Sequence, residues 1–153
     1  MKSPVAKAEM LIRKPAAKVF EAFIDPAITS RFWFTKGSAR LEAGKSVRWD
    51  WEMYGLSMQA DVLAVEKDRR ILVGWSAYGS SEIEFLFTPR GPDQTFVSIS
   101  HRGFRGTPEE MTDAAIGSTE GFTFVVSGLK AWLEHGIELK LVHDRFPDKQ
   151  VQN

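Results

Sequence analysis

Cysteine is absent from the chain of 153 residues, so disulfide bonds, thiolate metal sites and a cysteine nucleophile are all excluded. A chain without cysteine fits the reducing environment of the cytoplasm. Residues 1–9 lack the apolar stretch of a signal peptide, and no apolar run approaches the ~18 residues that a membrane span needs. We therefore expect a cytoplasmic protein with no membrane span.

An excess of charge of either sign is also absent, because 20 Lys and Arg residues balance 20 Asp and Glu residues. Proteins that bind nucleic acids normally carry a basic excess, so nucleic acid is not an expected partner. The composition, 43% apolar and 26% charged, is ordinary for a globular protein. Since the chain has no repeat, low-complexity tract or linker, we expect one domain over residues 1–153.

Motifs for catalysis and cofactor binding are lacking as well. The three histidines, His101, His135 and His143, do not have the spacing of metal ligands. There is no nucleophile elbow, P-loop or dinucleotide fingerprint. We expect no metal and no cofactor, and we assign no catalytic residue. His101 is the one acid–base candidate; the other interpretation is a histidine that a neighbour or water satisfies by a hydrogen bond.

Aromatic residues, in contrast, are abundant: five Trp, eleven Phe and two Tyr make up 12% of the chain. Most of them must be buried, because large exposed aromatic patches are uncommon on monomeric proteins. Ligand pockets are mostly apolar and aromatic, whereas a dry core relies more on Leu, Ile and Val. The aromatic excess therefore favours a ligand pocket, with ordinary core packing as the alternative.

The N-terminal part of the chain predicts one strand followed by two short helices. The strand covers residues 5–12, and Pro15 suits the first turn of a helix because its missing N–H costs nothing there. Asp25-Pro26 ends that helix, since the residue before proline avoids the α region. We expect the second helix to run from Ala27 to about Trp33 and to end at Lys36-Gly37.

Strict alternation of apolar and polar residues then predicts a run of strands, each with one buried and one wet face. Their short connections imply an antiparallel meander. The carboxylates between the apolar residues are expected on the solvated face. The apolar faces carry Val47, Trp49, Trp51 and Met53; Leu56, Met58, Ala60 and Val62; Ile71, Val73 and Trp75; Ile83, Phe85 and Phe87; and Val97, Ile99 and His101.

A long helix is predicted after the last strand. Thr107 is its N-cap, Pro108 takes the first position and Glu110 completes a capping box. Gly136 is the expected C-terminal stop. A helix of about 28 residues spans roughly 42 Å, which is long enough to cross a whole domain.

Three glycines, Gly117, Gly121 and Gly128, interrupt this helix and lie near one another on one face. Each glycine costs about 1 kcal/mol relative to alanine in a helix interior. Either another group approaches the backbone closely at these positions, or the helix bends. The segment from residue 137 onward has no clear pattern, and it forms either part of a two-fold interface or a cover that packs back on the domain.

The order of these elements, from residue 5 to residue 136, resembles the helix-grip fold of the START-like (SRPBCC) superfamily, and in particular the branch of the activator of the heat-shock protein 90 ATPase. The resemblance is carried by three local motifs. They are Ile12 to Phe23 with Pro15-Ala16 and Val19-Phe20; Asp25-Pro26 followed by Arg31-Phe32-Trp33-Phe34; and Gly121-Phe122 followed by Leu129 and Leu133. Phe122 stands where that branch often has Trp.

The resemblance implies an α+β fold in which a curved antiparallel sheet of about six strands wraps around the long C-terminal helix, with two short helices after the first strand. It also implies a pocket between the concave face of the sheet and the helix, with Trp33 near its entrance. The residues expected to line that pocket are Trp49, Trp51, Met58, Trp75, Phe85, Phe87, Ile99 and His101 from the sheet, and Phe122, Val125, Val126 and Leu129 from the helix.

Three functions remain open, because the superfamily includes carriers, receptors, cyclases and co-chaperone domains. The first is the binding of a small hydrophobic or amphipathic ligand, lipid-like or aromatic. The second is an interaction module for a chaperone or another protein, although in that branch the activity also draws on a second domain for which we expect no room here. The third, ranked last, is an enzyme of the cyclase or hydrolase type. A homodimer is left open as an alternative to a monomer.

Overall fold

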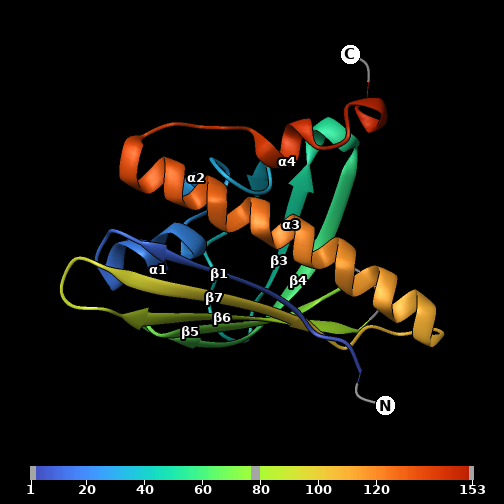
Figure 1. The fold of residues 1–153 in the computed structure, drawn as a ribbon, viewed down its shortest axis with the longest axis horizontal. Coiled ribbons are helices and arrows are strands. Elements are labelled where there is room, and N and C mark those ends of the chain that lie inside the picture. The colour runs from blue at the N-terminus through green and yellow to red at the C-terminus, as the bar shows by residue number, and fades with distance from the viewer. Residues whose placement is uncertain (1–2, 77–79, 152–153) are drawn as a thin grey trace.

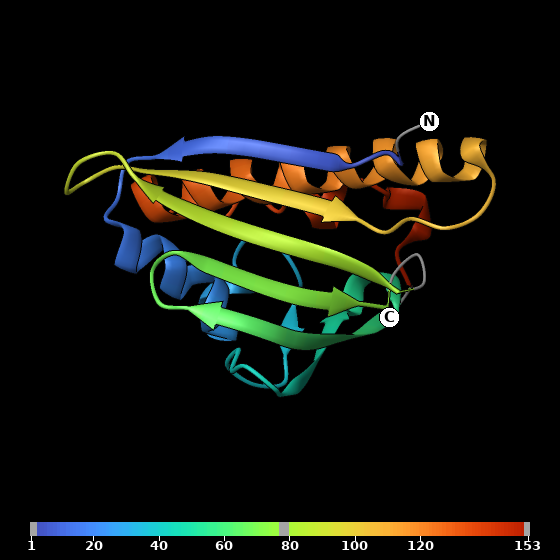
Figure 2. The ribbon, with the colours of Figure 1, turned by 90° about the horizontal axis from the view of Figure 1, so that it is seen from below.

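The computed structural model describes residues 3–76 and 80–151. Its sheet has seven antiparallel strands in the order β1-β7-β6-β5-β4-β3-β2, and a long helix crosses one face of it (Figures 1 and 2). The expected helix-grip fold is thereby confirmed. The strands are β1 (Ala6–Ile12), β2 (Lys36–Gly37), β3 (Ser46–Trp51), β4 (Leu56–Glu66), β5 (Arg70–Trp75), β6 (Ser81–Pro89) and β7 (Thr95–Arg102). The helices are α1 (Ala16–Ile24), α2 (Pro26–Thr29), α3 (Pro108–His135) and α4 (Leu141–Asp144), with short 3₁₀ turns η1 (Glu52–Tyr54) and η2 (Pro147–Lys149).

The alternation of the strands sets which face is buried, as predicted. Paired residues such as Phe85 and Ile99 oppose each other across β6 and β7, and both are buried on the inner face. Leu56 is an exception, since it is 41% exposed at the first position of β4, next to the turn at Gly55. A register shift between Val62 and Ala64 interrupts the pairing of β4 with β5.

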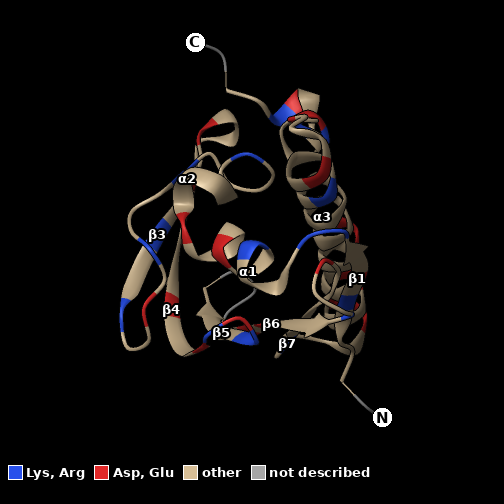
Figure 3. Cartoon of the chain, turned by 90° about the vertical axis from the view of Figure 1, so that its left-hand side faces the viewer, with Lys and Arg blue, Asp and Glu red and all other residues tan. Residues whose placement is uncertain are grey.

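The outer face of the sheet is polar and carries cross-strand ion pairs, as expected. Arg70 on β5 and Arg102 on β7 both bind the Glu84 carboxylate on β6, at 2.7 and 3.0 Å. The Arg70 guanidinium, hydrogen-bonded to Glu84, lowers the pKa of that carboxyl group. Figure 3 shows basic and acidic residues mixed over the molecule rather than separated into single-sign surfaces.

The prediction for the second short helix is wrong in length. Helix α2 has only four residues, because after Thr29 the backbone continues in turns, with the Arg31 N–H bonded to the Ile28 carbonyl oxygen and the Phe32 N–H to that of Thr29. Lys36-Gly37 does not end a helix but forms β2, which pairs with β3 and adds the seventh strand. A side chain at Gly37 would place Cβ 2.7 Å from Pro26 Cβ, so this approach requires glycine.

Helix α3 begins and ends where the sequence predicts. Thr107 and Glu110 form a reciprocal capping box, and Gly136 closes the helix in the left-handed region with φ of 65°. The helix packs mainly along β1 and also against β7. At Gly128 the backbone is approached closely, since a Cβ there would lie 3.1 Å from Phe32 Cβ. One of the three helix glycines therefore serves packing.

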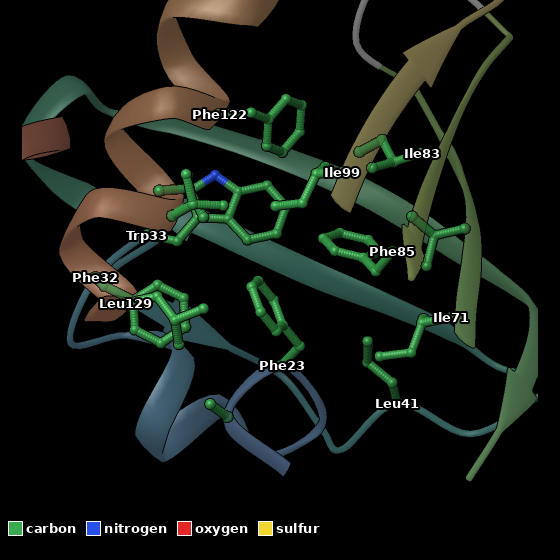
Figure 4. Packing of buried hydrophobic residues seen from close by; sticks show 14 of the residues in the cluster. Phe23, Phe32, Trp33, Leu41, Ile71, Ile83, Phe85, Ile99, Phe122 and Leu129 are labelled. Atoms are coloured by element: carbon green, nitrogen blue, oxygen red, sulfur yellow. The ribbon is translucent and has the colours of Figure 1, made fainter. Parts of the chain in front are cut away.

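Aromatic rings fill the space between the sheet, α1 and α3. Trp33 lies at the centre of this core, and its ring centroid is 6.1 Å from that of Phe85 and 5.5 Å from that of Phe122 (Figure 4). Phe23 from α1 packs against Phe85 and Phe32 in the same cluster. Much of the aromatic excess is therefore core packing.

The segment after α3, residues 137–151, runs back along the molecule toward the β3–β4 end, where α4 lies beside η1 (Figure 1). We call this segment the tail. It is fixed there by a backbone hydrogen bond of 2.8 Å from the Val151 N–H to the Met53 carbonyl oxygen. Packing back on the domain, one of the two expected outcomes, is thus observed. Among residues 3–76 and 80–151, no helix is long and apolar enough to cross a membrane.

Candidate functional site: a pocket between the long helix and the tail

A pocket of about 340 Å³ opens where the middle of α3, the end of β5 and the tail come together. Its wall combines side chains from the core, backbone of the helix and residues of the tail. The lining residues are Trp33, Tyr54, Trp75, Gly117, Ser118, Glu120, Gly121, Phe122, Phe124, Val142, Arg145 and Phe146.

Three aromatic rings form the inner wall of the pocket. Trp33, Trp75 and Phe122 contact one another with centroid separations of 5.5 to 6.2 Å, all tilted or edge-on. Such contacts hold each ring by its neighbours and produce a rigid apolar surface. The indole N–H of Trp75 is buried and has no hydrogen-bond partner among the described residues.

Two glycines of α3 form the helical side of the pocket. Gly117 and Gly121 are one helical turn apart, so both lie on the same face of the helix. A Cβ atom built on Gly121 meets no other atom within 4 Å, which means that the glycine borders open space. Unlike Gly128, it is not required by any close contact with the rest of the protein.

The tail supplies the outer wall. Arg145 forms an ion pair with Glu120 on α3, and its guanidinium lies 4.3 Å from the centre of the Phe146 ring. The Arg145 guanidinium also donates a hydrogen bond to the Glu120 carboxylate, and this bond lowers the pKa of the Glu120 carboxyl group. Both partners are about 40% exposed, at 41% and 44%, so the ion pair lies at the mouth of the pocket.

Tyr54, from η1, ties the tail to the sheet. Its single hydroxyl proton is shared between the carbonyl oxygens of Val142, at 2.5 Å, and His143, at 3.0 Å. The same oxygen accepts the N–H of Phe146 at 3.3 Å. Burial raises the pKa of this phenol, so it stays protonated and remains a donor. This one hydroxyl group therefore makes three of the contacts that hold the outer wall, beside the Val151–Met53 hydrogen bond and the Arg145–Glu120 ion pair.

His101 lies directly behind the pocket wall. It is fully buried, with Nδ1 2.7 Å from the Ser118 hydroxyl and Nε2 2.8 Å from the Ser81 hydroxyl. Burial lowers its pKa to about 4, so the ring is neutral at pH 7. The hydrogen bonds agree with the interpretation of a histidine satisfied by its neighbours, and Ser118 separates it from the cavity.

The structure divides the expected lining residues into separate groups. Trp33, Trp75 and Phe122 line the pocket, and His101 lies one hydrogen bond behind it. Met58 is half-buried against the core. Trp33, expected near the entrance, is only 7% exposed at the centre of the core. The remaining residues are buried in the core away from the pocket wall: Trp49, Trp51, Phe85, Phe87, Ile99, Val125, Val126 and Leu129. Ligand binding by any of the thirteen remains a prediction.

Sequence reasoning missed the tail residues and the polar groups of the pocket. The glycine pair was a usable signal, because two glycines one turn apart in a long helix are costly unless they border something. No comparable signal marked Val142, Arg145 or Phe146, whose segment has no periodicity. In the described residues there is also no group of His, Asp and Glu side chains that could hold a metal ion.

An open antiparallel sheet that wraps a long C-terminal helix defines a protein of the START-like helix-grip class. Within that class, the chain belongs to the family of activator of Hsp90 ATPase homolog 1-like proteins, whose model matches residues 13–134. The resemblance found in the sequence is thereby confirmed. The matched region includes strands β2 to β7 and nearly all of α3, but neither β1 nor the tail.

Solved structures share the fold. The protein SSP2350 from Staphylococcus saprophyticus is 28% identical, with a TM-score of 0.77 over 89% of this chain and 96% of that one. The protein MLL2253 from Mesorhizobium loti is 21% identical, with a TM-score of 0.75 over 87% and 98% of the two chains. Aha1 from Colwellia psychrerythraea, solved as a dimer in solution, is 18% identical, with a TM-score of 0.74 over 86% and 97%. No curated protein sequence matches the chain.

Proposed function

We propose that the protein binds a small amphipathic molecule, aromatic in its apolar part, in the pocket between α3 and the tail. The observation that carries this proposal is Gly121, a glycine in the interior of a helix that borders open space. Alanine at this position would favour the helix by about 1 kcal/mol. A glycine kept against that preference is explained if a bound molecule approaches the helix backbone there.

The volume of the pocket favours a compact ligand. Pockets for drug-sized molecules measure roughly 300 to 1,000 Å³, and this pocket, at about 340 Å³, is at the lower end of that range. A molecule of two or three fused rings is therefore a better match than a long acyl chain. The rings of Trp33, Trp75 and Phe122 offer stacking and edge contacts to such a molecule.

The polar groups of the pocket favour an amphipathic ligand. Ser118 contributes a hydroxyl group near the inner wall, while Glu120 and Arg145 place charges at the mouth.

The test is to block the pocket without disturbing the core. In Gly121→Leu, the new side chain extends into the open space in front of the helix, so we expect the fold to persist and binding to fall at least tenfold. Binding of naphthalene derivatives is measured by fluorescence quenching of Trp33 and Trp75 and by thermal shift. Thr123→Leu, exposed on the same helix and outside the pocket wall, is the matched control. Unchanged binding in Gly121→Leu, or no binding by the unmodified protein, would contradict the proposal.

A second candidate is a co-chaperone type of protein interaction, which family membership favours. Its test is the ATPase rate of a purified Hsp90-class chaperone with and without the chain; no change in rate would count against it. Gly121→Leu separates the two functions, because a surface interaction does not need an open pocket. An enzyme that uses His101 remains the weakest alternative, since burial keeps that imidazole a poor base. The cytoplasmic location, the partners and a homodimer remain predictions.

A further inference from the structure

We infer that Ser118 offers the pocket a hydrogen-bond acceptor and no donor, so that the site selects ligands carrying a hydroxyl or N–H group against isosteric ligands without one. The inference rests on the proposed function and names the class of ligand that the pocket takes. Three buried side chains, Ser81, His101 and Ser118, are joined by hydrogen bonds, and the inference follows from which group donates in each bond.

Ser81 sets which group donates in each of these hydrogen bonds. The Ser81 hydroxyl donates its proton to the carbonyl oxygen of Trp75 at 3.1 Å. A hydroxyl group has one proton, so towards His101 the Ser81 oxygen acts as an acceptor. The Nε2 atom of His101, 2.8 Å away, must then carry a proton and donate it.

The imidazole carries no second proton. His101 is fully buried, and the rings of Trp75, Phe104 and Phe122 surround it at centroid distances of 5.4, 4.6 and 5.9 Å. This apolar surrounding disfavours the charged form. A neutral imidazole protonated at Nε2 has an acceptor at Nδ1, so the Ser118 hydroxyl at 2.7 Å donates to it.

Ser118 therefore has its single proton committed to His101, and only the lone pairs of its oxygen remain for a ligand. Ser118 lines the pocket beside Gly121, where a Cβ atom would meet nothing within 4 Å, so there is room for a ligand group to approach. Phenols, alcohols and amines can donate to this oxygen, whereas ethers and ketones cannot. A neutral hydrogen bond of this kind changes affinity by roughly two- to tenfold.

The test compares 2-naphthol with 2-methoxynaphthalene, which share the ring system; the second compound lacks the donor and carries one added methyl group, whose effect on affinity Ser118→Ala leaves in place. In the unmodified protein we expect 2-naphthol to bind more tightly. In Ser118→Ala the affinity ratio should fall by roughly two- to tenfold through weaker binding of 2-naphthol alone. Ser127→Ala, which removes a hydroxyl bonded to its own helix at Thr123, is the matched control and should leave the ratio unchanged.

A ratio that is the same in the unmodified protein and in Ser118→Ala would overturn the inference, even if both compounds bind and the proposed function stands. Nitrogen-15 NMR of the ring of His101 gives a second, ligand-independent measurement on the unmodified protein. We expect the Nε2–H tautomer, and the Nδ1–H tautomer would overturn the inference. Absence of binding by both compounds would overturn the proposed function, and this inference with it.

Discussion

Replacing Gly121 by alanine should make the protein more stable, although the residue lies in the wall of the candidate site. Alanine is favoured over glycine by about 1 kcal/mol in a helix interior, because glycine loses more backbone entropy on folding. The added methyl group meets no atom within 4 Å, so no steric cost offsets this gain. For a protein of this size, about 1 kcal/mol raises the melting temperature by about 2–4 °C.

The matched control is Gly128→Ala on the same helix. The helix propensity gain is the same there, but the new Cβ lies 3.1 Å from Phe32 Cβ and 3.5 Å from the Phe32 carbonyl oxygen. Phe32 is itself packed in the core, so it has little freedom to move. We expect this variant to be neutral or less stable than the unmodified protein.

Urea unfolding at pH 7 followed by Trp fluorescence measures both variants on the same scale. The reasoning distinguishes a glycine that borders open space from one that packing requires. It is wrong if Gly121→Ala lowers the free energy of unfolding. It is also wrong if Gly128→Ala raises that free energy by as much as Gly121→Ala does. A more stable Gly121→Ala that also binds 2-naphthol less tightly would mean that stability is given up at this position for binding.

Two further predictions concern pH and the tail. The folded pKa of His101 is about 4 and its ordinary value is 6.5, so the unfolded chain binds more protons between these values and stability falls as the pH is lowered through them. From pH 7 to pH 5 we expect the free energy of unfolding, measured with urea, to fall by about 2 kcal/mol. This fall should be absent in His101→Gln. The same dependence of stability on pH in both proteins would refute the prediction. Tyr54→Phe should lower stability by about 1 kcal/mol and expose the tail to proteolysis, whereas Arg145→Gln, which removes an exposed ion pair, should change stability by less than about 1 kcal/mol. Equal protease sensitivity of these two variants would refute the role of Tyr54.

The sheet and the long helix could be predicted because their signals are local. Alternation fixes which residues of a strand face inward, and the capping box at Thr107 and the glycine at Gly136 fix the ends of the helix. The second helix was overestimated because nothing in the sequence shows that the backbone bonds change to turns after Thr29, from the Arg31 N–H to Ile28 and from the Phe32 N–H to Thr29. Hydrogen bonds of this kind depend on the turn already being formed.

The site was predicted less completely, for a physical reason. Alternation shows that Trp49 and Trp75 both face inward, but it does not show which of them reaches the cavity. That depends on what covers each position: Trp49 is 2% exposed beneath Trp33 and Phe34, whereas Trp75 lies at the end of β5 beside the pocket. The cover of Trp49 comes from the segment after α2, and the wall beside Trp75 comes from a tail without periodicity, so both contributions became visible only in three dimensions.

The tail has a consequence for engineering. The family model ends at residue 134, while Val142, Arg145 and Phe146 from the following segment complete the pocket. The scaffold and the outer wall are thus encoded in consecutive stretches of the chain, joined by the contacts of Tyr54, Met53 and Glu120 with the tail. Transplanting residues 137–151 of this chain onto a relative, or the corresponding segment of a relative onto this chain, would therefore exchange the outer wall in a single cassette. Under the proposed function, such an exchange should change ligand preference without altering any residue of the sheet.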